Sequence, residues 1–465
     1  MESFSCLAVD MGAGSIRIVQ GIFTDKLVVN EIYRFENHIE WMNGADRWNL
    51  NTITDGIRKG ITLAFEQTEV PVLSVGVDSW GVDFVLLDKT GKPVEDAVSY
   101  RDSRTVGMKE KWNELIPALE TFQLTGINYN IFNSLYQLLS IKDSVQLKDT
   151  NRILFMADYV NYLLSGKSVN ELTLSASSQM VNYKNADFDP DILSLLNCNS
   201  LFSKPVLPGM RLGKLTGFEH NNTEVITVAG HDTASAVAAI PFTDKNAAYI
   251  STGTWCIIGM LSDQPFISDR AFTMGITNEV TADGKYRPSM NLIGLWLVQQ
   301  LRVAFGSHSS FSDIEELIST TPTSAYLIDT SDESFYNPVN MKEAFDNFLK
   351  DHWGIEFNTE AAYYRCAYDS LAESFRKKLL SFEELRGEPF NTIHLIGGGC
   401  RSKLLCQLTA NATGKKVIAG PVEAAVMGNL MIQVESLGKM NPECRKMISE
   451  SMAIATYLPE KEGTL

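Results

Sequence analysis

The chain has 465 residues, of which 45% are hydrophobic and 21% are charged, as is ordinary for a soluble globular protein. Its length predicts two to three domains and a core that needs no metal or disulfide to hold it together. The net charge of −16 excludes broad contact with nucleic acid or an anionic membrane, which would require a basic face. It still allows an anionic ligand that is held by backbone N–H groups and a metal ion.

The cysteines and the N-terminus point to the cytoplasm. The seven cysteines are scattered and form no Cys-x-x-Cys, which indicates reduced thiols rather than a disulfide framework. The first residues lack the basic and apolar regions of a signal peptide. Since no stretch of 18 residues is free of polar interruptions, we expect no membrane span.

The first half of the chain opens with an apolar run, a tight glycine turn and a second run over residues 6–23, which together predict a β-hairpin. Later in this half, an apolar run leads into Gly230-His231-Asp232-Thr233 and a helix of small residues over 234–239. The remaining predicted elements of this half are a helix and three strands, at 53–65, 73–78, 84–88 and 225–229.

The second half repeats the opening pattern, because residues 247–260 also predict a hairpin with a tip of small residues. Ser312 and Asn340 are then expected to cap helices. A strand at 393–396 runs into three glycines and a helix that Gly414 ends. Such a glycine run lets a nucleotide approach the backbone closely.

The two hairpins suggest two related domains, and alternating strands and helices favour the α/β class. The predicted domains are 1–242 and 243–465.

Two acidic residues at strand ends are candidates for chemistry. Asp10 ends a buried strand beside a turn of small residues, where a carboxylate can hold Mg²⁺ through water next to N–H groups for phosphates; a plain hairpin is the alternative. Asp232 follows a strand and starts a helix, where it could accept the proton of a substrate hydroxyl or only cap the helix. His231 beside it is more typical of substrate contact than of catalysis, and histidine spacing predicts no zinc site.

Two carboxylates and a tryptophan surround Gly81 in the stretch 78–84, a composition that suits a sugar, although a bulged strand would explain it equally. The chain contains no Walker A, Gly-x-Gly-x-x-Gly, Gly-x-Ser-x-Gly or His-Glu-x-x-His pattern. P-loop, simple Rossmann, hydrolase-elbow and zincin chemistries are therefore not expected.

Together these motifs resemble the FGGY family of carbohydrate kinases, over nearly the whole chain and in the same order. The stretches that carry the resemblance are 76–84, 100–105, 231–236, 251–255, 291–299, 397–400 and 418–424. Within the family the chain looks closest to the kinases of L-rhamnulose. The resemblance implies an actin-like (ribonuclease H-like) duplicated two-domain fold with a central cleft. It also implies a cytoplasmic enzyme, monomer or homodimer, whose partners are a sugar and ATP with Mg²⁺ as cofactor.

The resemblance assigns roles to individual residues. Asp232 would be the catalytic base, and Asp10 would help to place Mg²⁺. The sugar would contact four residues: Gly81, His231, Thr233 and Asn291. ATP would contact eight: Ala13, Gly14, Ser15, Ile16, Arg17, Thr254, Gln299 and Gly398.

One departure concerns the first phosphate loop, where the family usually has serine at 14 and glycine at 16. Here these positions hold Gly14 and Ile16. Gly14 keeps the backbone accessible, but a β-branched Ile16 resists a positive φ, so the departure bears on the geometry of the loop.

The implied reaction is transfer of the γ-phosphoryl group of MgATP to the C1 hydroxyl of L-rhamnulose. Three alternatives remain: a kinase of L-fuculose or a pentulose, a sugar sensor without catalysis, and an actin-like ATPase or phosphatase that uses no sugar.

Overall fold

The computed structural model describes residues 2–219 and 222–460. The chain folds as two units, of which the first comprises Met1–Ala239, Ser262–Pro288 and Ala424–Ser451. The second comprises Ile240–Leu261, Ser289–Glu423 and Met452–Leu465. The first unit thus draws on three stretches of chain, and the last of them carries a late helix, α16 (Ala424–Ser436), which packs against the first strand.

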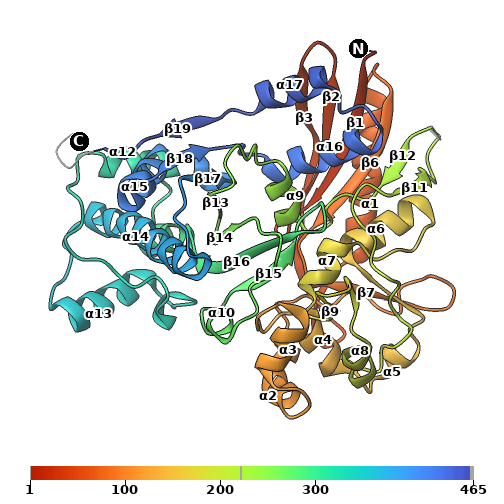
Figure 1. Cartoon of the computed structure of the whole chain (residues 1–465), viewed down its shortest axis with the longest axis horizontal. Helices are drawn as coiled ribbons and strands as arrows, with labels where there is room; N and C mark the ends of the chain where they lie inside the picture. The colour runs from red at the N-terminus through yellow and green to blue at the C-terminus, as the bar shows by residue number, and fades with distance from the viewer. Residues whose placement is uncertain (1, 220–221, 461–465) are drawn as a thin grey trace. The chain divides into compact units, whose positions relative to one another are not determined.

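The first unit is built on a six-stranded sheet in the order β11-β12-β6-β1-β2-β3 (Figure 1). Strand β1 is buried at every position, pairs with β2 antiparallel and runs parallel to β6. The predicted first hairpin is therefore confirmed. The strands are β1 (Phe4–Met11), β2 (Ser15–Phe23), β3 (Leu27–Glu36), β6 (Val72–Ser79), β11 (Arg211–Lys214) and β12 (Glu224–Ile226).

Helices cover this sheet. The predicted helix at 53–65 is α1 (Leu50–Gln67), which packs against β2 and β3 with its isoleucines buried. α16 packs against β1, β6 and the short helix α9 (Asp232–Ala238). Contact with α9 is close, because a Cβ at Gly428 would lie 1.7 Å from the Ser235 carbonyl oxygen.

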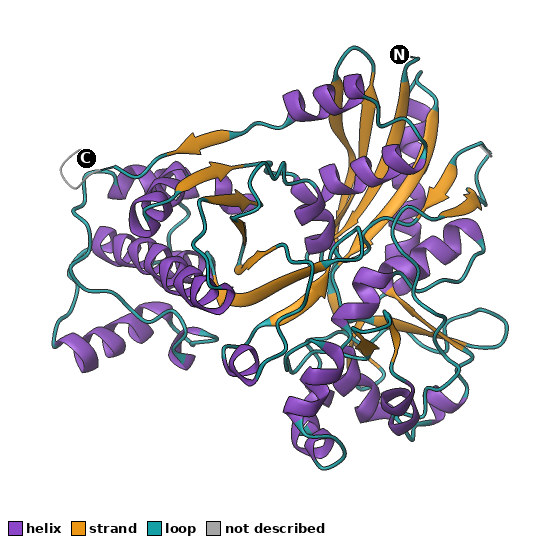
Figure 2. Cartoon of the chain, viewed as in Figure 1, coloured by secondary structure: helices purple, strands orange, loops and turns teal. Residues whose placement is uncertain are grey.

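The rest of the first unit consists of short helices and two-stranded ribbons, with strands and helices intermixed (Figure 2). The ribbons and the strand that follows Ser262 are β4 (Ile39–Met42), β5 (Ala45–Trp48), β7 (Phe84–Leu87), β8 (Arg152–Phe155), β9 (Val181–Asn182), β10 (Asp187–Phe188) and β15 (Thr277–Val280). The helices are η1 (Ser103–Thr105), α2 (Met108–Asn113), α3 (Ala118–Thr125), α4 (Ser134–Ile141), α5 (Val145–Lys148), α6 (Met156–Ser165), α7 (Leu172–Ser177), α8 (Pro190–Leu195), α10 (Asp269–Thr273) and α17 (Pro442–Ser451).

The second unit contains most of the larger sheet, whose strand order is β15-β16-β14-β13-β17-β18-β19; β15 and residues 286–288 of β16 belong to the first unit. β13 pairs antiparallel with β14 and parallel with β17, so the second predicted hairpin is confirmed as well. The strands are β13 (Ala247–Thr252), β14 (Trp255–Met260), β16 (Tyr286–Ile293), β17 (Thr392–Ile396), β18 (Lys416–Ala419) and β19 (Ala455–Tyr457). The helices are α11 (Trp296–Ala304), α12 (Phe311–Ile318), η2 (Glu333–Phe335), α13 (Met341–Trp353), α14 (Glu360–Arg386), η3 (Gly398–Arg401) and α15 (Lys403–Thr413).

One of the two predicted helix caps is confirmed and the other is wrong. Asn340 caps α13 by accepting from two main-chain N–H groups. The helix expected after Ser312 begins two residues earlier, with Ser310 as its cap. Ser310 is the cap rather than Ser312 because its hydroxyl accepts from the Asp313 N–H, while the Asp313 carboxylate accepts from the Ser310 N–H. Two N–H groups at the start of the helix are thereby satisfied.

All seven cysteines are buried free thiols, as predicted. Across residues 2–219 and 222–460, no helix combines the length and the apolar character needed to cross a membrane.

Candidate active site

Asp10 lies near the end of β1, between a carboxylate and a cation on the neighbouring strands. In the sheet register it stands opposite Asp78 on β6 and opposite Arg17 on β2. The Arg17 guanidinium donates to the Asp10 carboxylate through Nε, at 3.0 Å, and through Nη2. Arg17 therefore neutralises Asp10 within the first unit itself.

Asp78, the carboxylate beside Asp10, is fully buried, which is unusual for an acidic side chain. The Asn429 amide of α16 donates to its Oδ2 at 2.5 Å, whereas its Oδ1 has no hydrogen-bond partner among the described residues. Burial raises the pKa of Asp78 well above its usual value, and the charges of Asp10 and Asp232 act in the same direction. A cation would be stabilised beside these carboxylates.

The tip of the first hairpin is tight. The Gly12 N–H donates to the Ser15 carbonyl at 3.0 Å, and a Cβ at Gly14 would meet no atom within 4 Å. Gly14 therefore leaves its backbone open to a ligand. Ile16, by contrast, is an ordinary strand residue whose side chain is fully buried in the core and whose φ is not positive. The loop therefore does not require a positive φ at position 16, and a β-branched residue fits there.

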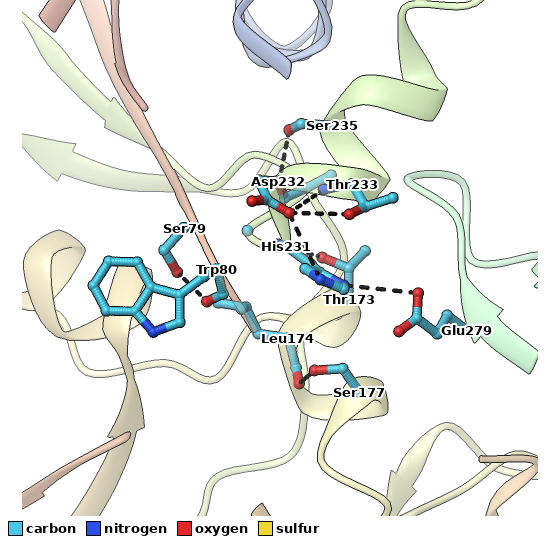
Figure 3. Close-up of polar contacts among 12 residues, drawn as sticks. Ser79, Trp80, Thr173, Leu174, Ser177, His231, Asp232, Thr233, Ser235 and Glu279 are labelled. Carbon is cyan, nitrogen blue, oxygen red and sulfur yellow. Dashed lines mark hydrogen bonds and ion pairs between the residues drawn. The ribbon is translucent and has the colours of Figure 1, made fainter. Parts of the chain in front are cut away.

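Asp232 takes the first position of α9, with its backbone fixed by neighbours. The Ser79 N–H donates to the Gly230 carbonyl at 2.8 Å, which ties the segment before Asp232 to the end of β6. The Asp232 carboxylate accepts from the Thr233 N–H at 2.5 Å and from its hydroxyl at 3.1 Å (Figure 3). Burial raises the pKa of Asp232, although the hydrogen bonds from Thr233 act in the opposite direction. Its side chain is still 36% exposed, which leaves a face for a substrate.

Glu171, which caps α7, binds the segment that precedes Asp232. No motif in the sequence marks this residue. Its buried carboxylate accepts from the Gly230 N–H at 3.1 Å and from the Thr173 hydroxyl at 2.6 Å. It also accepts from the N–H groups of Thr173 and Leu174, at 2.9 and 3.1 Å. The same Thr173 hydroxyl accepts from the His231 N–H at 3.1 Å. Burial raises the pKa of Glu171 to about 7, against the lowering effect of these donors.

His231 is held on its other side by a pair that sequence reasoning also missed. Arg287 of β16 is fully buried and forms an ion pair with Glu279 of β15. Its Nη2 lies 3.0 Å from Nδ1 of His231. Figure 3 shows the His231 ring between Asp232 and Glu279.

Gly81 faces the same ring. A Cβ at this position would lie 3.2 Å from Nε2 of His231 and 3.2 Å from the Ser177 hydroxyl, so a side chain here would be crowded. The next residue, Val82, has a φ of 69°, which is strained for a β-branched residue. The predicted sugar residues Gly81, His231 and Thr233 thus lie in one region of the first unit.

Buried polar contacts hold this strained connection. The Asp83 carboxylate accepts from the indole N–H groups of Trp48 and Trp80, at 2.6 and 2.9 Å. Gln137 donates to Asp83 at 3.2 Å and to the Val82 carbonyl at 3.2 Å. Strain maintained by surrounding contacts is typical of functional sites.

The second unit contains the other predicted residues. The Thr254 hydroxyl, at the second hairpin tip, donates to the Gln299 side chain of α11 at 3.3 Å. Gly398 follows β17, and a Cβ there would meet no atom within 4 Å, whereas one at Gly397 would lie 2.7 Å from the Thr252 carbonyl oxygen. Asn291 is exposed on β16.

Comparison with known proteins identifies the family. The N-terminal domain model of the FGGY family of carbohydrate kinases matches residues 5–239, and its C-terminal domain model matches residues 248–437. This chain belongs to the FGGY family. As an FGGY kinase it is an ATP-dependent phosphotransferase with a carbohydrate as acceptor.

Solved structures of similar fold include other kinases. Gluconate kinase from Lactobacillus acidophilus is 15% identical, with a TM-score of 0.80 over 99% of this chain and 94% of that one. Xylulose kinase from Rhodospirillum rubrum gives the same four values. Glycerol kinase from Plasmodium falciparum, solved with ADP, is 13% identical with a TM-score of 0.81, at 99% and 94% coverage. The predicted α/β, actin-like (ribonuclease H-like) two-domain FGGY fold is confirmed.

FGGY kinases use a divalent metal with ATP, and the first unit has suitable groups for Mg²⁺. Asp10 and Asp78 bring two carboxyl groups side by side, and the Oδ1 of Asp78 has no hydrogen-bond partner among the described residues. Within residues 2–219 and 222–460, no cluster of three or more His, Cys, Asp or Glu side chains is arranged to bind a metal directly. Mg²⁺ commonly keeps several waters and binds through one or two carboxylates and the phosphates of its nucleotide, so these residues fit the ion.

Proposed function

We propose that this FGGY kinase is a rhamnulokinase, which transfers the γ-phosphoryl group of ATP to the C1 hydroxyl of L-rhamnulose. The observation that carries the proposal is the strained connection after β6. There Gly81 faces His231, and Asp83 binds the indoles of Trp48 and Trp80. This connection belongs to the stretch that most resembles the L-rhamnulose kinases.

Asp232 supplies the base in this proposal. Its carboxylate accepts the proton of the C1 hydroxyl while that oxygen bonds to the γ-phosphorus of ATP, and the bond to the bridging oxygen of ADP breaks. The raised pKa of Asp232 makes the carboxylate a better proton acceptor. The Thr233 N–H and hydroxyl hold it in place during the transfer.

The nucleotide would bind through backbone at two glycine turns and through three side chains. Gly14 and Gly398 leave open backbone, while Arg17, Thr254 and Gln299 offer polar groups. Mg²⁺ would be held at Asp10, with Asp78 beside it, through water. When bound, it would neutralise charge on the phosphates.

A second candidate is a kinase of another ketose, such as L-fuculose or a pentulose. It is favoured by similarity in fold to solved xylulose kinases. A coupled assay of ADP release with L-rhamnulose, L-fuculose, D-xylulose and L-ribulose separates the two. Comparable kcat/KM for L-rhamnulose and another ketose would refute the narrow assignment. A rate of ADP release that is the same with and without each ketose would favour an ATPase or phosphatase.

The Asp232→Asn substitution tests the base. A positioned general base contributes about 10²- to 10⁴-fold, so kcat should fall by that factor while the affinity for ATP stays unchanged. Asp189→Asn is the matched control, because Asp189 is also a carboxylate at the start of a helix of the first unit, where it caps α8. Turnover by Asp232→Asn at the wild-type rate would refute the catalytic role and leave a sugar sensor or a different base.

A further inference from the structure

The two ring nitrogens of His231 have very different surroundings. Nδ1 lies 3.0 Å from Nη2 of Arg287 and 3.8 Å from Oε2 of Glu279. Nε2 lies 3.7 Å from Oδ1 of Asp232 (Figure 3). The ring is mostly buried, with 13% of its side chain exposed, so these neighbours determine which hydrogen bonds each nitrogen can make.

The Arg287 guanidinium determines which ring nitrogen of His231 carries the hydrogen of the neutral ring. An arginine side chain has five donors, no acceptor and a permanent charge. At 3.0 Å it can only donate, so Nδ1 must present its lone pair. The ring hydrogen then lies on Nε2, and the ring is neutral, because a second N–H at Nδ1 would oppose the guanidinium directly.

Glu279 is what allows a fully buried guanidinium to remain here. It forms an ion pair with Arg287 and is itself 15% exposed, and the Arg287 Nε also donates to the Val280 carbonyl at 3.2 Å. A buried charge is tolerated when it is paired and hydrogen-bonded. The charged groups in contact with the His231 ring are therefore Arg287 and Glu279 at Nδ1 and Asp232 at Nε2.

The Nε2–H lies on the side of the ring that faces Asp232, whose side chain is 36% exposed. A Cβ at Gly81 would approach Nε2 to 3.2 Å, so the absence of a side chain at Gly81 avoids crowding of this nitrogen. Asp232, on the same side of the ring, is a pure acceptor when ionised. A donor and an acceptor therefore stand side by side, a pattern that suits two neighbouring oxygens of one sugar.

We propose that the Arg287–Glu279 pair locks His231 as the neutral Nε2–H tautomer, so that His231 donates to the sugar oxygen next to the hydroxyl that Asp232 deprotonates. In a ketose phosphorylated at C1, that oxygen is on C2, and its lone pairs make it a suitable acceptor. Arg287 and Glu279 are positioning residues, since they act through His231. The inference rests on the proposed function for the identity of the sugar and for the role of Asp232 as base.

The tautomer can be read directly by nitrogen-15 NMR of histidine-labelled protein without sugar or nucleotide. The chain has six histidines, and a His231→Gln variant assigns the signal of interest. For the neutral ring we expect a lone pair at Nδ1 and a hydrogen at Nε2. A neutral ring with its hydrogen on Nδ1 overturns the proposal. This measurement stands even if no ketose is turned over, an outcome that would instead refute the proposed function.

The Arg287→Gln variant provides the functional test. It leaves Glu279, an acceptor, as the charged group facing Nδ1, so the hydrogen of the neutral ring should move to Nδ1 and Nε2 should no longer donate. Loss of a correctly placed donor weakens binding by about 0.5–1.5 kcal/mol, so the KM for the ketose should rise about two- to tenfold, with the KM for ATP unchanged. Arg287→Lys, also a donor without an acceptor, should keep the wild-type tautomer and recover most of the ketose affinity. A wild-type ketose KM in Arg287→Gln, or loss of the tautomer in Arg287→Lys, would contradict the role of the pair.

Discussion

Two adjacent glycines after β17 offer a test in which stability and nucleotide binding change separately. Gly397 has a φ of 81°, and a Cβ there would lie 2.7 Å from the Thr252 carbonyl oxygen. Gly398 has an ordinary φ, and a Cβ there would meet nothing within 4 Å. The same alanine substitution should therefore have opposite consequences at the two positions.

The magnitudes follow from these geometries. Gly397→Ala forces a side chain into a strained conformation, at a cost of about 2 kcal/mol, which should lower Tm by roughly 4–8 °C for a unit of this size. Gly398→Ala should instead stabilise the protein by about 0.4–1 kcal/mol, because it restricts the unfolded chain. If the nucleotide contacts Gly398, the added methyl should cost about 1–3 kcal/mol of binding, a roughly 5- to 150-fold rise in the KM for ATP.

Differential scanning fluorimetry gives Tm, and the ADP-release assay gives KM for each substrate. The expected result is a Gly398→Ala variant with unchanged or higher Tm, raised KM for ATP and unchanged KM for the ketose. Gly397→Ala serves as the matched control for a structural role. A normal KM for ATP in a stable Gly398→Ala variant would show that the nucleotide does not contact this turn.

The first hairpin allows a similar comparison. Gly14→Ala should keep Tm and raise the KM for ATP, whereas Gly12→Ala should raise this KM and also lower Tm, because its Cβ would lie 2.9 Å from a main-chain oxygen of the turn. Equal Tm values in the two variants would contradict this. Gly428→Ala should prevent α16 from packing on α9, since its Cβ would lie 1.7 Å from the Ser235 carbonyl oxygen, and a wild-type Tm would refute that. Glu171 has a pKa raised from 4.5 to about 7, so its stabilising effect is complete below pH 4.5 and is lost as the pH rises through 7, by up to about 3 kcal/mol. The fall in Tm between pH 5 and 8.5 should therefore be smaller in Glu171→Gln than in wild type, and equal slopes would contradict it.

Local patterns in the sequence predicted the elements that local physics determines. Both hairpins, the helix at 53–65 and the glycine run at 397–399 are found where expected, because apolar spacing and turn residues suffice for them. The error at Ser312 has the same origin. Ser310 and Ser312 both precede Asp313, and only the reciprocal bonds of the folded helix select Ser310.

Residues that support the site through long-range contacts could not be predicted in this way. Glu171 meets Gly230 across 59 residues, and Arg287 meets His231 across 56. Neither stands in a recognisable motif, since a lone acidic or basic residue in a chain of 96 charged residues carries no signal. The strained φ of Val82 was equally invisible, because it is imposed by the bonds from Ser134 and Gln137 to the Val82 carbonyl.

The late helix α16 also constrains the order in which the protein can form during synthesis. Its Gln433 donates to the Leu7 carbonyl and accepts from Ser74, and its Asn429 binds Asp78. The strands that carry Asp10 and Asp78 therefore cannot bind Asn429 and Gln433 until about 200 further residues have been synthesised after Ala239. At typical rates of synthesis this takes roughly 10–40 s. A nascent chain that ended near Ala239 would leave buried polar groups of β1 and β6 unmatched, and such a chain would be a natural substrate for chaperones.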